Sequence, residues 1–344
     1  MRSFAIGVDL GGTNLRIAAV DEQGTLLEKL TTGTQVAKGR DHVIGDMTDA
    51  ITQVSEKLRG TAELAGIGIG VPGIIDMSTG MLRESPNLPG WSDYPVHSEI
   101  ERRLGTQVFL ENDANAAALG EQWLGAARDF GSMCMLTLGT GVGGGIVLDG
   151  MIWHGMNGMA GELGHITVQP DGRQCGCGNL GCVEQYASAT AIVRMAREAI
   201  AAGTAPELAH ATESEDKILD ARRVYQMAIQ GDRPAQEIFH RVGQALGIVI
   251  ADFVNALNLP MFVVGGGVSS AWDAFAPKMM EEVRRRSFVY AATAPDLAEA
   301  AGFPDRKTTV ITRALLGSDA GLFGAARIPL LPAERARHLH RRTV

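Results

Sequence analysis

The sequence has few cysteines, no excess of positive charge and no long hydrophobic run, and each shortage excludes a class of protein. Four cysteines in 344 residues, with no signal-peptide pattern in MRSFAIGVDLGG, favour a reducing compartment over a disulfide framework. A formal net charge of −8 lacks the basic stripe that nucleic acids require. No run of about 18 apolar residues is present to span a bilayer. We therefore expect a cytoplasmic protein that binds neither nucleic acid nor membrane.

The composition is that of a soluble globular protein, with glycine as the unusual element. Hydrophobic residues make up 45% and charged residues 20% of the chain, which excludes a disordered or fibrous protein and allows two domains with cores. The 43 glycines are about 12% of the residues, against an average near 7%. Clustered glycines mark backbone that approaches something closely. The one basic cluster, in residues 334–344, is expected to be a solvated terminus.

Glycine and threonine form two similar bends between apolar runs. The runs 4–8 and 15–20 flank DLGGTN, and the runs 133–138 and 146–148 flank GTGVGGG. Each pattern reads as strand, bend, strand and acidic turn, which predicts two similar domains whose bends face one cleft. Backbone N–H groups and threonine hydroxyls in such bends suit the phosphates of a nucleotide. The simpler interpretation is that the glycines only make tight hairpins.

A dinucleotide-binding or Walker A site is not indicated. G-x-G-x-x-G occurs twice, beginning at Gly68 and at Gly139. The first contains Pro72 and opens no helix, and the second runs into another strand, whereas the dinucleotide fingerprint requires a strand, a tight turn and a helix. No G-x-x-x-x-G-K-[ST] sequence is present.

Three of the four cysteines lie in the glycine-rich run 161–184 together with one histidine. Structural zinc prefers four tetrahedral nitrogen and sulfur ligands, which favours a metal site over a disulfide or redox-active thiols. Four protein ligands leave no open position for water, so such a site is structural. The glutamates that bracket the cluster, Glu162 and Glu184, are left for another task. The candidate ligands are His165, Cys175, Cys177 and Cys182.

The remaining elements follow from apolar spacing. Asp113 follows a strand and precedes an alanine-rich run, so it is either a helix cap or a functional carboxylate. Asn112 and Asn115 also suit that helix start. Cys134 lies in an apolar strand and is expected in the core. Helices are expected at 187–202, 234–256 and 319–326, buried strands at 65–71, 261–264 and 310–312, and a polar surface insertion at 204–220.

Motifs along almost the whole chain resemble one family. They are DLGGTNLR at Asp9, VPG at Val71, SPNLPGW at Ser85, ENDANAAALGE at Glu111, LGTGVGGG at Leu138, GELGH at Gly161, CGCGNLGCVE at Cys175 and GGGVS at Gly265. Together they resemble the ROK family of sugar kinases and sugar-responsive repressors. The resemblance implies an α/β, actin-like and hexokinase-like (ribonuclease H-like) fold of two domains, with ATP and a hexose meeting in the cleft, and it also implies the structural zinc.

The domain boundaries are expected as follows. Residues 1–112 form a small N-terminal domain that the helix at about 313–328 completes. Residues 113–312 form a larger α/β domain with the zinc site, and residues 329–344 form a flexible tail.

The resemblance also implies roles for single residues. Asp113 takes the proton of the attacking hydroxyl, and Asp9 orients Mg²⁺ through water. His165 binds zinc with one ring nitrogen and faces the sugar with the other. The expected sugar contacts are Gly73, Asn87, Asn112, Asp113, Glu162, His165 and Glu184. The expected nucleotide contacts are Asp9, Gly11, Gly12, Thr13, Asn14, Thr140, Gly141, Gly265, Gly266 and Gly267.

Two positions leave alternatives open. Many family members carry lysine where this chain has Asn14, so positive charge on the phosphates is expected from Arg16 or the metal. Trp91 either flanks the sugar loop or anchors an aromatic ring at the surface.

The expected activity is transfer of the γ-phosphoryl group of ATP to the 6-hydroxyl of glucose. N-acetylglucosamine, N-acetylmannosamine, fructose and allose kinases of the same family are alternatives, since the sugar-side residues are shared. A repressor is disfavoured, because the DLGGT strand starts within about ten residues of Met1 and leaves no room for a helix-turn-helix domain. An actin-like chaperone or filament protein has no use for the sugar-side glutamates. A dimer or tetramer is expected.

Overall fold

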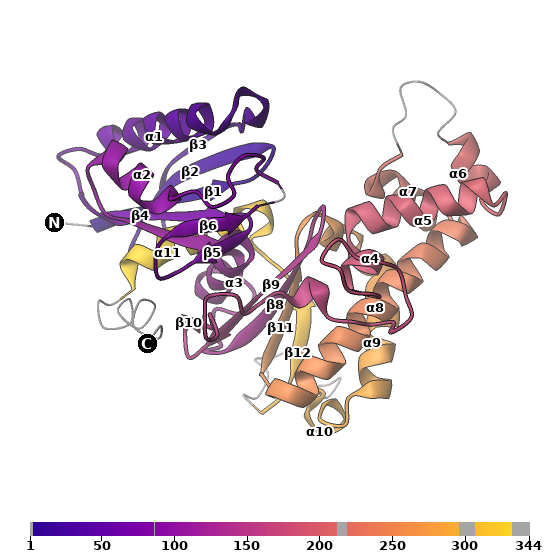
Figure 1. Cartoon of the computed structure of the whole chain (residues 1–344). Helices are drawn as coiled ribbons and strands as arrows, with labels where there is room; N and C mark the ends of the chain where they lie inside the picture. The colour runs from indigo at the N-terminus through magenta and orange to yellow at the C-terminus, as the bar shows by residue number, and fades with distance from the viewer. Residues whose placement is uncertain (1–2, 86, 212–218, 296–306, 332–344) are drawn as a thin grey trace. The chain divides into compact units, whose positions relative to one another are not determined.

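The computed structural model describes residues 3–85, 87–211, 219–295 and 307–331. The chain divides into two units, and each unit is formed by segments that are not continuous in sequence (Figure 1). Unit 1 comprises Met1–Met133, Gly145–Gly161 and Ser318–Val344. Unit 2 comprises Cys134–Gly144 and Glu162–Gly317.

Unit 1 is built on a five-stranded sheet with the order β3-β2-β1-β4-β7. The first three strands are antiparallel neighbours, whereas β4 runs parallel to β1 and β7 runs parallel to β4. The hairpin expected around Asp9 is therefore confirmed. The strands are β1 (Ser3–Leu10), β2 (Asn14–Asp21), β3 (Leu26–Gly33), β4 (Glu63–Val71) and β7 (Val108–Asn112).

Alternation along β1 directs its side chains to two different layers. Phe4, Ile6 and Val8 share a buried cluster with Ile44 on one helix and with residues of a second, as expected for residues two apart on a strand. A second cluster joins residues of β2 to the C-terminal helix. The helices and remaining strands of this unit are η1 (Val36–Lys38), α1 (Arg40–Lys57), β5 (Ile74–Asp76), β6 (Met81–Glu84), α2 (Val96–Leu104), α3 (Asp113–Trp123) and α11 (Ala320–Leu330).

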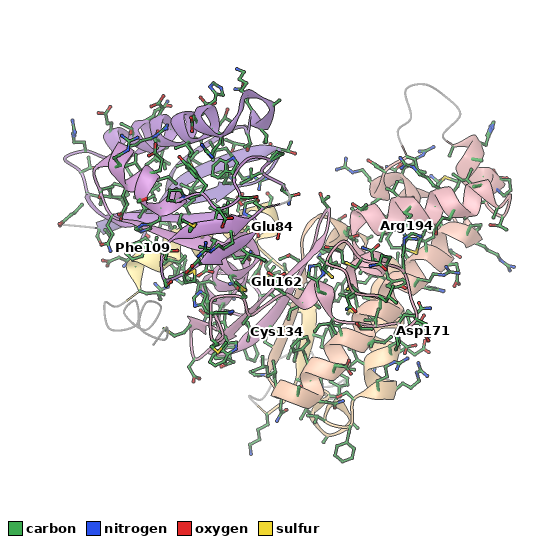
Figure 2. The ribbon with its side chains drawn as sticks, viewed as in Figure 1. Glu84, Phe109, Cys134, Glu162, Asp171 and Arg194 are labelled. Carbon is green, nitrogen blue, oxygen red and sulfur yellow. The ribbon has the colours of Figure 1, made fainter. Side chains whose placement is uncertain are left out.

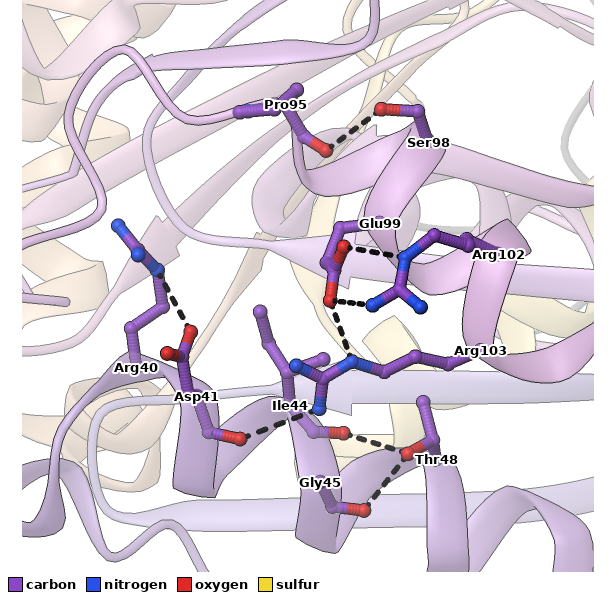
Figure 3. Close-up of polar contacts among 10 residues, drawn as sticks. All are labelled: Arg40, Asp41, Ile44, Gly45, Thr48, Pro95, Ser98, Glu99, Arg102 and Arg103. Atoms are coloured by element: carbon purple, nitrogen blue, oxygen red, sulfur yellow. Dashed lines mark hydrogen bonds and ion pairs between the residues drawn. The ribbon is translucent and has the colours of Figure 1, made fainter.

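Helices α1 and α2 are joined by a surface network of polar contacts (Figure 3). The Glu99 carboxylate accepts from Arg102 and from Arg103, at 2.7 Å in each case, and Arg103 also donates to the Asp41 carbonyl at 3.4 Å. The hydrogen bonds from these two guanidinium groups lower the pKa of Glu99 to about 2. The network is exposed, so it aligns the helices with little gain in stability.

Helix α11 packs against β1, β4 and α3 at very short range because glycine lines the contact. A Cβ placed at Gly68 of β4 would lie 1.9 Å from the Ala325 carbonyl oxygen, and one at Gly324 would lie 1.6 Å from the Ala116 carbonyl oxygen. Any side chain there would collide with backbone. This packing puts α3 in unit 1, whereas the boundary expected at residue 113 placed it in the second domain.

A second sheet has the order β10-β9-β8-β11-β12, and β8 and β9 each contribute residues to both units. The second glycine bend lies between β8 and β9, as predicted. Cys134 is buried in β8, where burial raises the pKa of its thiol to about 12, so its expected place in the core is confirmed (Figure 2). The strands are β8 (Met133–Leu138), β9 (Val142–Leu148), β10 (Met151–Ile152), β11 (Met261–Gly265) and β12 (Val310–Arg313).

The helical part of unit 2 centres on the pair α8 and α9, which pack closely where α8 carries glycine. A Cβ at Gly247 would lie 2.6 Å from the Met279 carbonyl oxygen. Glu282 of α9 is buried; burial raises its pKa, but hydrogen bonds from Arg285, Arg286 and Lys278 outweigh that and lower it to about 2. The elements are η2 (Leu163–His165), α4 (Glu184–Ala187), α5 (Ala189–Ala201), α6 (Pro206–His210), α7 (Ala221–Ile229), α8 (Arg233–Leu257), η3 (Gly267–Ala271), α9 (Trp272–Arg286), α10 (Tyr290–Thr293) and η4 (Gly317–Asp319).

Most predicted elements are confirmed, with three differences. The helix expected at 187–202 is α5, which begins at Ala189 because Ser188 caps it with its side chain. The insertion at 204–220 contains α6, and its residues 212–218 lie outside the described residues. Helix α11 continues to Leu330, so the expected tail from residue 329 begins inside it; residues 332–344, with the basic cluster, are not described. Among the described residues, no helix has the length and apolar character that a membrane crossing requires.

Candidate functional site

The first glycine bend joins β1 to β2. The Gly11 N–H donates to the Asn14 carbonyl at 2.9 Å and closes the bend, while Gly12 and Thr13 are exposed. Asp9 faces Arg16 across the hairpin, with Arg16 Nη1 3.0 Å from its carboxylate. Burial raises the pKa of Asp9, and the Arg16 guanidinium opposes that shift.

Arg16 makes a second contact within unit 1. The same Nη1 also donates to the Ser318 carbonyl at 3.1 Å, just before α11. The positive charge expected to reach the phosphates from Arg16 is therefore directed at Asp9.

The second glycine bend, Gly139–Gly141, is tied to the start of α5. The Gly139 N–H donates to the Gly141 carbonyl at 2.9 Å, and the Thr190 hydroxyl donates to the Thr140 carbonyl at 2.7 Å. Glu184 accepts from the Val142 N–H at 3.0 Å. The structure thus places Glu184 against this bend, although sequence reasoning grouped it with the sugar contacts.

The third glycine segment ends β11. Gly265 is the last residue of the strand, and Gly267 opens η3. Gly266 has a φ of 81°, and a Cβ there would lie 2.4 Å from the Leu138 carbonyl oxygen. Only glycine fits both the left-handed backbone and this close approach to the end of β8.

Asp113 lies where β7 passes directly into α3. Asn112 is the N-cap of this helix: its side-chain oxygen accepts from the Ala114 N–H at 2.9 Å and from the Asn115 N–H at 3.2 Å. Asp113 is the first helical residue, so of the candidate caps it is Asn112, and not Asp113, that occupies the N-cap position. The Asp113 carboxylate also accepts from the Ala114 N–H, at 2.9 Å. We call Glu111, Asn112 and Asp113 the Asp113 bend.

Several expected site residues of unit 1 converge on this bend. The Asn112 amide donates to the Gly73 carbonyl at 3.1 Å. A Cβ at Gly321, in the first turn of α11, would lie 3.5 Å from the Asp9 carboxylate and 3.8 Å from the Asp113 carbonyl oxygen. The Asp9 side chain and the Asp113 backbone therefore lie close to the same helix start. Beside the first glycine bend, a Cβ at Gly12 would lie 3.3 Å from the Asn87 carbonyl oxygen.

The expected metal ligands of unit 2 come together. The ligand atoms of His165, Cys175, Cys177 and Cys182 all lie within 4.8 Å of one another. Cys175 Sγ is 3.7 Å from His165 Nδ1, and Cys177 Sγ is 3.7 Å from Cys182 Sγ. A disulfide requires an S–S distance near 2.05 Å, so these two sulfurs are not bonded to each other.

The spacing of this cluster fits a tetrahedral ion. Zn–S bonds of about 2.3 Å at the tetrahedral angle separate two sulfurs by roughly 3.8 Å, close to the observed 3.7 Å. The remaining ring nitrogen of His165, Nε2, lies 4.0 Å from the Glu162 carboxylate. Figure 2 labels Glu162, whose side chain is about half exposed. The histidine therefore presents one nitrogen to the thiols and the other to a carboxylate.

The chain is similar to known proteins over almost its whole length. Residues 5–330 match the model of the ROK family. The chain belongs to the ROK family. A glucokinase from Thermotoga maritima is 41% identical over 302 residues, which cover 86% of this chain and 94% of the relative. A glucokinase from Halalkalibacterium halodurans is 39% identical, covering 93% of this chain and 92% of the relative.

The solved structures agree on the fold. A ROK family glucokinase from Streptomyces griseus, in complex with glucose and AMPPNP, superimposes with a TM-score of 0.75 at 33% identity and covers 94% of this chain and 98% of its own. The expected actin-like, hexokinase-like α/β fold is confirmed by this likeness and by the family match.

Sequence reasoning missed one buried pair in this ROK chain. His154, just after β10, lies with Nε2 2.7 Å from the Glu111 carboxylate, and the two side chains are only 12% and 2% exposed. Burial lowers the pKa of His154, but the charge and hydrogen bond of Glu111 outweigh it and raise the pKa. The only signal in the sequence was a charged residue at the end of an apolar strand.

Trp91 is buried, which contradicts one of the two interpretations offered for it. Its side chain is 1% exposed and packs edge-to-face on Tyr94, with ring centroids 6.3 Å apart. The surface-anchor interpretation is therefore wrong. Trp91 belongs to the core of unit 1 at the end of the loop that carries Asn87.

Proposed function

We propose that this chain is an ATP-dependent glucose kinase that transfers the γ-phosphoryl group of ATP to the 6-hydroxyl of glucose. The observation that carries the proposal is that the Asp9 carboxylate and the Asp113 backbone both lie beside Gly321 in the first turn of α11. Two near full-length relatives named glucokinase and the glucose and AMPPNP complex of a third support the substrate and the donor.

Asp113 acts as the general base in this proposal. Phosphoryl transfer needs the attacking hydroxyl held in line and its proton removed, and a carboxylate at the start of a helix supplies both. The Asn112 cap and its hydrogen bond to the Gly73 carbonyl fix the direction of the helix start. The proposed sugar contacts besides the base are Gly73, Asn87 and Asn112 in unit 1, and Glu162, His165 and Glu184 in unit 2.

Asp9 is the proposed residue for Mg²⁺. Its carboxylate oxygens are the kind of ligand that Mg²⁺ takes, usually through water, and the ion neutralises charge on the phosphates. The exposed N–H groups of the first bend and those of the second suit the phosphates themselves. The proposed nucleotide contacts are Gly11, Gly12, Thr13, Asn14, Thr140, Gly141, Gly265, Gly266 and Gly267.

The cysteine and histidine cluster is proposed to hold a structural zinc ion. Its donor set and spacing support this assignment. With Nδ1 on the metal, the ring of His165 is fixed and Nε2 remains directed toward Glu162 and the sugar. The zinc then has no catalytic step of its own.

The test is an ADP-release assay with a panel of hexoses. Comparing kcat/KM for glucose, N-acetylglucosamine, N-acetylmannosamine, fructose and mannose is expected to rank glucose first. Absence of turnover with every hexose contradicts the kinase proposal. Preference for another sugar supports the proposed kinase activity but contradicts the assignment of glucose as the substrate.

A further inference from the structure

The buried pair of Glu111 and His154 has no role in the mechanism above. Glu111 is the penultimate residue of β7, and His154 belongs to the segment after β10, 43 residues further along the chain. A carboxylate that is 2% exposed is costly to bury unless it is paired and fully hydrogen-bonded. Glu111 has such partners, and they show which groups it holds in place.

The contacts of Glu111 show what that geometry controls. One carboxylate oxygen accepts from the Asn112 backbone N–H at 3.0 Å and from the Asn115 side-chain amide at 3.0 Å. The other oxygen contacts His154 Nε2 at 2.7 Å. Glu111 therefore holds the backbone just before Asp113 and the first turn of α3, and His154 holds Glu111.

His154 also fixes the segment that follows it. Its carbonyl accepts from the Ala160 N–H at 3.1 Å, which closes a loop two residues before Glu162. Among the described residues, Glu111 is the group whose charge acts on His154. The pair thus connects this loop to the Asp113 bend inside unit 1.

We propose that His154, through its ion pair with Glu111, is a positioning residue that sets the orientation of the Asp113 bend for phosphoryl transfer. The proposal rests on the proposed kinase function. His154 itself contacts neither sugar nor nucleotide in this role. When it is removed, the buried carboxylate loses its charged partner and must take up a proton or shift toward water, and Asn112 and Asn115 move with it.

The expected effect falls on kcat. A displacement of the base by about 1 Å costs on the order of 10²-fold in rate. His154→Gln is the test variant because glutamine can still donate a hydrogen bond and the protein is expected to fold. Its kcat is expected to fall about 10- to 100-fold, while KM for glucose changes by less than about threefold.

A matched control lies at the other end of the same strand. His97 of α2 has Nε2 3.0 Å from the Val108 carbonyl at the start of β7 and 3.5 Å from Glu101. His97→Gln makes the same chemical change beside another glutamate in the same unit. Its kcat is expected to stay within about twofold of the unaltered enzyme, in line with a partly exposed site. Equal losses in both variants overturn the proposal.

Rescue tests the pairing itself. Adding Glu111→Gln to His154→Gln removes the unpaired buried charge, so part of kcat is expected to return. A further, additive loss contradicts a coupled pair.

Hydrogen exchange tests the orientation without any activity. The backbone amides of Asn112, Ala114 and Asn115 donate to side chains of the bend. They are expected to exchange about tenfold faster in His154→Gln than in His97→Gln, with unchanged far-UV circular dichroism. Unchanged exchange overturns the positioning role. If the unaltered protein phosphorylates no hexose, the proposed function fails, and exchange still decides this inference.

Discussion

The Asp113 bend in unit 1 and the cysteine and histidine loop in unit 2 are both polar sites, yet they are held in different ways. The bend lies between a strand and a helix, and its side chains form hydrogen bonds with backbone groups. The loop is held by backbone contacts, including isolated β-bridges between Thr167 and Cys182 and between Gln174 and Leu180, and Cys177 Sγ lies 3.7 Å from Cys182 Sγ. The contacts of the first site join protein groups to one another, whereas the donor set and spacing of the second fit a metal ion.

The two sites are therefore expected to respond to different perturbations. A site fixed by its own hydrogen bonds responds to substitutions in its packing and pairing. A site completed by an ion responds to loss of that ion. The predictions below test whether the two regions fail independently.

The largest effect is expected from Asp113→Asn. Loss of a general base lowers kcat by roughly 10²- to 10⁴-fold, while glucose still binds because asparagine keeps the shape and hydrogen-bonding capacity. Coupled kinetics and calorimetric titration of glucose measure the two effects. Asp41→Asn on α1, an exposed position, is the control. Activity above about a tenth of the unaltered enzyme would contradict the base assignment.

Removal of the proposed metal is expected to have the next largest effect. A strong zinc-selective chelator, applied with Mg²⁺ in excess, is expected to lower glucose affinity about tenfold, with nucleotide affinity unchanged, because His165 and Glu162 lose their fixed positions. Binding titrations and metal analysis of the protein measure this. Cys134→Ala, in the core of the sheet, is expected to retain the metal, whereas Cys177→Ala loses it. Unchanged glucose affinity after chelation would show that the metal does not support sugar binding.

The α3–α11 contact and the cysteine and histidine loop also differ in how tightly they are packed. Gly324→Ala is expected to lower the free energy of unfolding by about 1–3 kcal/mol, because the new Cβ meets the Ala116 carbonyl oxygen. Gly176→Ala, in the cysteine loop, has nothing within 4 Å of the new Cβ and is expected to change it by less than about 0.5 kcal/mol. Denaturant unfolding of both variants measures the difference. Similar losses would mean that the loop is as tightly packed as the α3–α11 contact.

The same comparison explains what the sequence could predict. The hairpin at Asp9, the strand before Asp113 and the cysteine cluster follow from local patterns of glycine, alternation and cysteine spacing. The fold followed from motif order along the chain. These signals are carried by residues close together in sequence.

The errors and omissions involve partners distant in sequence. The pairing of Glu111 with His154 and the contact of Glu184 with the Val142 N–H depend on tertiary packing that no local pattern encodes. Trp91 is buried because β6 and α2 close around its loop. Among the candidate caps that the sequence offered, Asn112 occupies the N-cap because its backbone is still extended, whereas Asp113 already belongs to the helix.

The smallest expected effect is a pH dependence confined to the bend. The pKa of His154 is raised in the folded protein, so the ion pair stabilises the fold fully below the unfolded histidine pKa of about 6.5. The contribution is lost as pH rises through the folded value, because both states are then neutral at this residue. The difference in unfolding free energy between the unaltered protein and His154→Gln is therefore expected to shrink as pH rises above neutrality. Denaturant unfolding across this range, with His97→Gln as the control, measures it; a difference that grows with pH would mean that His154 is neutral in the folded protein and that Glu111 is held by other donors.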